Sequence, residues 1–113
     1  MIVGTTISCL DGGALYSPEF PRGGLAATFV VDVQQLVLGG ATQFDVEIEH
    51  RNSDETTFAS VGPFSAITAA GVSDVDYTGI KEIIRFKYGF SGGTPAADDA
   101  ANFLMMAPSW RPY

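Results

Sequence analysis

The sequence predicts an all-β protein: a single antiparallel β-sandwich of about eight strands, jelly-roll-like in type. Two segments carry this prediction. From Phe44 to His50 apolar residues alternate with acidic ones, and from Ile84 to Phe90 they alternate with basic residues and a glycine. Because successive side chains of a strand point to opposite faces, each segment must bury one face and expose the other. The 13 Gly and 6 Pro among 113 residues fit short strands joined by turns within one domain.

The first half of the chain is predicted to hold three strands and one irregular segment. Residues 2–10 form a strand that ends at a turn with two glycines, and residues 27–34 form a second strand with clear alternation. Residues 14–24 contain two prolines, which cannot donate to a β-ladder, so this segment is predicted to be an extended arm with aromatic anchors. Residues 42–51 contain the acidic strand.

The second half is predicted to hold the remaining strands and an aromatic tail. The only candidate helical turn, at 96–101, is too short to matter. Strand order stays open, because it depends on pairing between distant segments. The whole chain, 1–113, is interpreted as one domain with the arm at 14–24 and a tail at 108–113. The strands predicted here are 56–61, a short stretch at 64–67, 72–77, 80–90 and 102–107.

Charge and composition exclude several classes of function. The net charge of −7 and the pI of about 4.3 oppose binding to nucleic acids and to anionic membranes. Cys9 is the single cysteine, so no disulfide can form within the chain, and its apolar surroundings favour a small buried side chain. The first residues lack the features of a signal peptide, and no apolar run reaches the ~20 residues that span a bilayer. We therefore expect synthesis in a cytoplasm.

The polar residues do not suggest a catalytic centre. His50 is the only histidine, and a catalytic histidine needs a nucleophile or an orienting carboxylate beside it. Because His50 continues the apolar face of its strand, a structural role is favoured. The glycine pairs mark turns, since no phosphate-binding glycine motif is present. We predict no catalytic residue and no cofactor.

An acidic row could suggest other chemistry. Asp45, Glu47 and Glu49 lie two residues apart, at a spacing of about 6.5–7 Å, which is wide for a shared calcium ion but within the range of paired glycosidase carboxylates. A solvated face paired with Arg85 and Lys87 on another strand is the preferred interpretation. The loop pairs at 54–55 and 98–99 would need backbone carbonyls to hold calcium, so no metal site is predicted.

Aromatic residues flank the predicted scaffold at both ends. Tyr16 and Phe20 lie in the arm, and Trp110, Arg111 and Tyr113 lie in the tail, with prolines close to each group. Trp, Tyr and Arg are enriched in protein interfaces. These five residues are predicted to bind a partner protein, although exposed aromatic rings could also stack on sugars.

The middle half of the chain resembles small β-sandwich structural proteins of tailed bacteriophages, of the head decoration or cement kind. The resemblance rests on residues 44–64, 67–71 and 83–88; Phe58–Phe64 fits the pattern F-x-x-V-G-x-F, and Ile83–Phe86 stands where a further core strand is expected. Related patterns occur in discoidin-like and carbohydrate-binding sandwiches. The matching positions belong to core and turns, so no functional residue is carried over.

This resemblance implies a non-enzymatic virion protein that binds the outer surface of the capsid and stabilises it. Its expected partner is the major capsid protein, and it is expected to form a homo-oligomer, for example a trimer. It would be made in the host cytoplasm and function on the capsid surface. Three alternatives stay open: a carbohydrate-binding module, another phage structural subunit of the tail or baseplate, and an enzyme that uses the acidic row.

Overall fold

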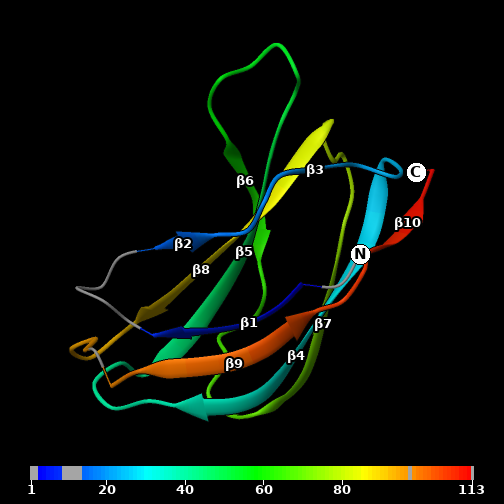
Figure 1. Cartoon of the computed structure of the whole chain (residues 1–113). Helices are drawn as coiled ribbons and strands as arrows, with labels where there is room; N and C mark the ends of the chain where they lie inside the picture. Colours follow the sequence, from blue (N-terminus) through cyan, green and yellow to red (C-terminus); the bar gives the residue numbers. More distant parts are fainter. Residues whose placement is uncertain (1–2, 9–13, 97, 113) are drawn as a thin grey trace.

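The computed structural model describes residues 3–8, 14–96 and 98–112, and within them the chain is all-β (Figure 1). Two antiparallel sheets pack into a sandwich, which confirms the predicted fold class. The strands are β1 (Val3–Ser8), β2 (Leu15–Tyr16), β3 (Phe20–Pro21), β4 (Ala26–Val37), β5 (Gln43–Arg51), β6 (Ala59–Pro63), β7 (Gly71–Tyr77), β8 (Ile83–Ser91), β9 (Ala100–Met105) and β10 (Ser109–Arg111).

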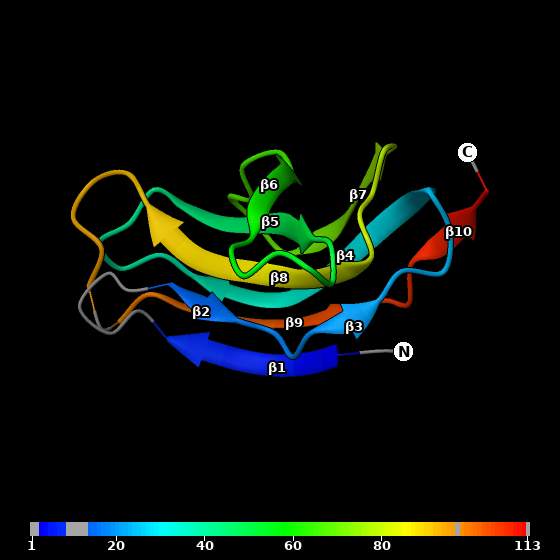
Figure 2. The same cartoon turned by 90° about the horizontal axis from the view of Figure 1, so that it is seen from above.

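In each sheet, two consecutive short strands pair one after the other with the same side of one neighbouring strand. Sheet A consists of β1, β9, β4 and β7, and β10 follows β9 on the same side of β4. Sheet B consists of β8, β5 and β6, with β2 and β3 both pairing along the free side of β8. Figures 1 and 2 show β2 leading into β3, and β9 leading into β10.

The order of the strands is that of a jelly roll. If β2 with β3 and β9 with β10 are each counted as one strand, the chain has eight, ordered 1-8-3-6 in sheet A and 2-7-4-5 in sheet B. Consecutive strands therefore mostly alternate between the sheets, as in the eight-stranded jelly rolls built from two Greek keys. This winding brings the first strand of the chain beside one of the last, since β1 pairs with β9.

Two of the predicted elements differ from the structure. The predicted strand at 56–61 lies later, as β6, and the predicted short strand at 64–67 is only an isolated bridge between Ile67 and Phe44. The Phe64 N–H donates to Val46 O and the Ile67 N–H to Phe44 O. Residues 65 and 66 therefore stand opposite the single residue 45 of β5, and an extra residue of this kind disrupts a ladder.

The arm and the tail are both parts of the sheets. Residues 15–22 of the arm run along the edge of sheet B, where Pro18 separates β2 from β3, in keeping with the confinement of proline to sheet edges. Within the tail, Ser109–Arg111 pair with Ala26–Thr28 of β4.

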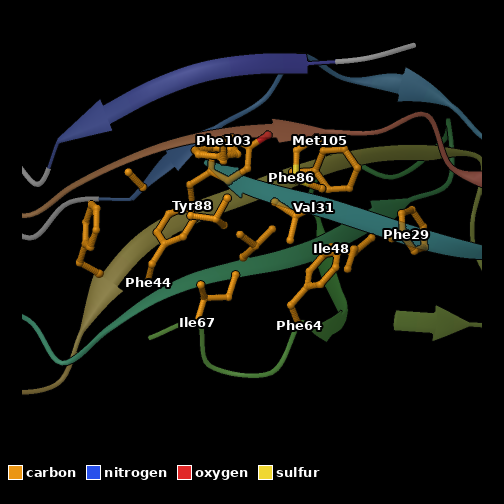
Figure 3. Close-up of a cluster of buried hydrophobic side chains, with 14 of the residues drawn as sticks. Phe29, Val31, Phe44, Ile48, Phe64, Ile67, Phe86, Tyr88, Phe103 and Met105 are labelled. Atoms are coloured by element: carbon orange, nitrogen blue, oxygen red, sulfur yellow. The ribbon is translucent and has the colours of Figure 1, made fainter. Parts of the chain in front are cut away.

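The core fills the space between the sheets with aromatic side chains. Phe44, Phe86 and Phe103 are fully buried, which confirms the face predicted from the alternation of β5 and β8. The Phe103 ring centroid lies 5.1 Å from that of Phe44 and 4.8 Å from that of Tyr88, and Figure 3 shows these three side chains grouped together. Phe29 continues the core at the other end of the cluster, with its ring edge-on to Phe86 at 6.0 Å.

Among the described residues, the buried polar side chains are those of Ser17, Glu49 and Asp99, and the side chain of Asp99 is fully buried. Its carboxylate accepts hydrogen bonds from the backbone N–H groups of Ala96 at 2.7 Å, Gly40 at 2.9 Å and Ala41 at 3.1 Å. Burial works to raise the pKa of Asp99, but these donors together outweigh it and hold the pKa below its ordinary value. Asp99 therefore joins the loop before β9 to the turn between β4 and β5.

Candidate functional site

The five residues predicted to bind a partner are divided among different places. Phe20, Trp110 and Arg111 come together at one end of the sandwich, because β3 and β10 both reach that end. Tyr16 lies apart from them, on the outer face of sheet B beside Arg85. Tyr113 lies outside the described residues.

An apolar hollow of about 540 Å³ opens where the arm and the tail meet. We call it the terminal hollow. The Trp110 ring stands edge-on to Phe29 at 6.2 Å between centroids, and the Phe20 ring lies against Phe86 at 5.4 Å. Both aromatic walls are thus fixed to the core, which gives the hollow a preformed shape. It is lined by Phe20, Pro21, Ala107, Pro108 and Trp110.

Trp110 also borders a second hollow, of about 490 Å³, whose rim is basic. Arg22 and Arg111 both line it, and the Arg111 guanidinium is held by a 2.9 Å hydrogen bond to Thr28 Oγ1. A Cβ atom at Gly23 would lie 2.6 Å from the indole, so the missing side chain allows the backbone to approach Trp110 closely. The end of the molecule therefore offers an aromatic ring between two hollows, with two arginines beside it.

The proline and alanine walls of the terminal hollow were not predicted as site residues. Pro21 and Pro108 each lie within two residues of a predicted aromatic anchor, so the proline-aromatic composition was the available signal. Ala107 has no feature in the sequence that marks it as part of a site. Its place follows from the turn between β9 and β10.

Tyr16 takes part in a cation–π stack. The Arg85 guanidinium lies 4.0 Å from the centroid of the Tyr16 ring and 4.0 Å from that of Phe58, while its Nε donates to Glu49 Oε1 at 2.8 Å. Tyr16 is still 49% exposed. Arg85 thereby fastens the β2 edge and the loop before β6 to the outer face of sheet B.

Replacement of Arg85 by Ala is expected to lower the free energy of unfolding by about 1–3 kcal/mol. Two cation–π contacts contribute about 0.5–1 kcal/mol each, and a partly exposed ion pair adds about 1 kcal/mol at most. Chemical denaturation measures this loss. Lys87→Ala is the matched control, because Lys87 is the next outward residue of β8 and makes no ion pair in the described part of the chain. Equal losses in both variants would contradict the role assigned to the stack.

Two of the three residues of the acidic row, Asp45 and Glu49, are held by neighbouring side chains. Asp45 accepts hydrogen bonds from Gln43 Nε2 and Ser91 Oγ, both at 2.5 Å. Glu49 pairs with Arg85, as the register Glu49↔Arg85 requires. Among the described residues, no group of three or more His, Cys, Asp or Glu side chains could hold a metal ion, and no helix could cross a membrane.

His50 acts as a hydrogen-bond acceptor. Its Nδ1 accepts the backbone N–H of Lys81 at 3.1 Å. Burial lowers the pKa of His50, and the positive charge of Lys81 lowers it further, so both favour the neutral ring that this hydrogen bond requires. His50 thus connects the end of β5 to the segment before β8.

Comparison with known proteins adds no assignment. No protein-family model matches the chain, and no curated protein matches it.

Proposed function

We propose that this chain is a non-enzymatic structural subunit of a tailed-phage virion that decorates the outer capsid surface and stabilises the shell. The observation that carries the proposal is the meeting of arm and tail at the terminal hollow, where two aromatic rings fixed to the core present a preformed apolar surface. Jelly-roll sandwiches are a recurrent architecture of viral capsid domains, which adds support by analogy.

The proposed mechanism is docking of this end onto the major capsid protein. Phe20 and Trp110 supply apolar area on rigid elements, so little side-chain freedom is lost on binding. Arg22 and Arg111 line the second hollow at the same end, where Arg111 lies 3.9 Å from Asp76, so this rim adds polar contacts around the apolar surface.

Repetition multiplies weak contacts on a capsid. Each copy needs to contribute only a few kcal/mol, since linking several copies raises the effective concentration of every further contact. A homo-oligomer, for example a trimer, that presents several terminal hollows toward neighbouring capsid subunits would use this effect. The subunit would be made in the host cytoplasm and join the particle there.

Quantitative mass spectrometry of purified particles tests the proposed function. We expect the chain in the particle fraction in a fixed ratio to the major capsid protein, and in heads that have been separated from tails. Its presence only in tails would favour the alternative of a tail or baseplate subunit. Its absence from all particles would contradict a virion role.

A further inference from the structure

A third hollow, of about 390 Å³, opens on the outer face of sheet B and is separate from the terminal hollow. We call it the Gly89 hollow. A Cβ atom built at Gly89 would meet no atom within 4 Å, and Gly89 is not among the glycines with positive φ. Its backbone conformation therefore does not require glycine. Because Gly89 has no side chain, its backbone is exposed at the bottom of the hollow. The lining also includes Ala14, Asp45, Glu47, Pro63 and Lys87.

Two oppositely charged residues that line this hollow do not pair with each other. Glu47 and Lys87 are directly opposite in the register of β5 and β8. Within the described residues, neither makes an ion pair within 4.0 Å or a side-chain hydrogen bond, whereas the other cations of this face, Arg51 and Arg85, are each paired with a glutamate. The hollow thus contains a hydrogen-bond acceptor, Glu47, and a donor, Lys87, that are available to a ligand above the exposed backbone of Gly89.

The ligand that fits these groups must donate and accept at the same time. A hydroxyl group does both, so adjacent hydroxyls of a sugar can donate to Glu47 and accept from Lys87. A neutral molecule also avoids the repulsion that Asp45, Glu47 and the net charge of −7 impose on anions. The open space above Gly89 leaves room for a sugar ring, and Ala14 and Pro63 supply apolar surface beside it. The volume falls within the range of about 300–1,000 Å³ seen for small-molecule sites.

We propose that the Gly89 hollow binds a single pyranose unit of a neutral glycan, with Glu47 and Lys87 as its polar contacts. This activity goes beyond the virion role and does not depend on it. It uses the outer face of sheet B and leaves the terminal hollow free for the capsid.

Titration of the isotope-labelled protein with methyl glycosides, followed by amide chemical shifts, tests the site. The probes are the methyl glycosides of glucose, galactose, mannose and N-acetylglucosamine. We expect at least one of them to cause saturable shifts of the Gly89 and Lys87 amides at millimolar concentrations. Gly89→Val should weaken this binding by about 10-fold or more, because the new side chain fills the floor. The variant should stay folded, since its Cβ meets no atom and valine favours strands.

Charge-matched variants separate a specific contact from a general effect of charge. Lys87→Gln should weaken binding by about 10-fold, because the glutamine amide replaces a charge-assisted hydrogen bond with a weaker neutral one. Lys81→Gln removes the same charge from a side chain that pairs with Glu55, away from the hollow, and should leave the affinity unchanged. Failure of all four glycosides to shift these amides, or unchanged binding by Gly89→Val, would overturn the proposal.

Discussion

Phe103→Ala is expected to lower the free energy of unfolding by about 3–5 kcal/mol, the loss typical of truncating a fully buried aromatic side chain. Phe103 is fully buried and its ring contacts Phe44 and Tyr88, both of sheet B, so the substitution opens a cavity between the two sheets. A domain of this size has a total stability of about 5–15 kcal/mol, so the substitution removes a large share of that stability. Chemical denaturation followed by tyrosine and tryptophan fluorescence measures the change.

Leu104→Ala is the matched control for this prediction. Leu104 follows Phe103 on β9 but lies on the opposite, outer face of sheet A, where it is half-buried. Its truncation should cost about 1 kcal/mol or less. If both variants lost a similar amount of unfolding free energy, the inward face of β9 would not be the buried one, which would contradict the sandwich core.

Ala107→Glu is expected to weaken binding to capsids by about 100-fold or more, which corresponds to about 2.7 kcal/mol. Ala107 is exposed at the wall of the terminal hollow, so a glutamate there would place an unpaired charge into an apolar interface. An unpaired charge that loses its water costs several kcal/mol unless a partner compensates it. The fold should not suffer, because surface substitutions of this kind change stability by about 0.5 kcal/mol or less.

The structure explains why a substitution is a sharper test than deletion of the tail. Ser109–Arg111 pair with β4, and Trp110 packs against Phe29. Removal of residues 109–113 would therefore uncover part of the core and confuse loss of binding with loss of the fold. Val72→Glu provides the control for Ala107→Glu, because it adds the same charge at a site on β7 that is 69% exposed and distant from the lining of the terminal hollow.

The sequence predicted the strands that have one buried face, because alternation with a period of two encodes that face directly. β5 and β8 confirm this, and so do the fully buried side chains of Phe44 and Phe86. The jelly-roll order could not be read in the same way. β9 pairs with both β1 and β4, and nothing local in residues 100–105 specifies partners that are so distant in the chain.

The candidate sites were predicted only in part, because they too depend on contacts between segments that are distant in the chain. Phe20 and Trp110 were selected because aromatic residues are common in protein interfaces. That they line the same hollow depends on how the strands of the two sheets are connected, which the sequence does not show. The stacking of Tyr16 on Arg85 was hidden because the two residues are far apart in the chain. The sequence placed Asp99 in a loop, but it did not reveal that the side chain is buried and bound by backbone N–H groups of two separate loops.

Binding of the protein to phage capsids that were assembled without it tests directly whether the terminal hollow docks onto the shell. The titration compares the wild type, Ala107→Glu and Val72→Glu after their folded stabilities have been shown to agree. The expected result is saturable binding by the wild type and by Val72→Glu, and a loss of about 100-fold in affinity for Ala107→Glu. No binding by the wild type, or equal binding by all three, would contradict docking through the terminal hollow.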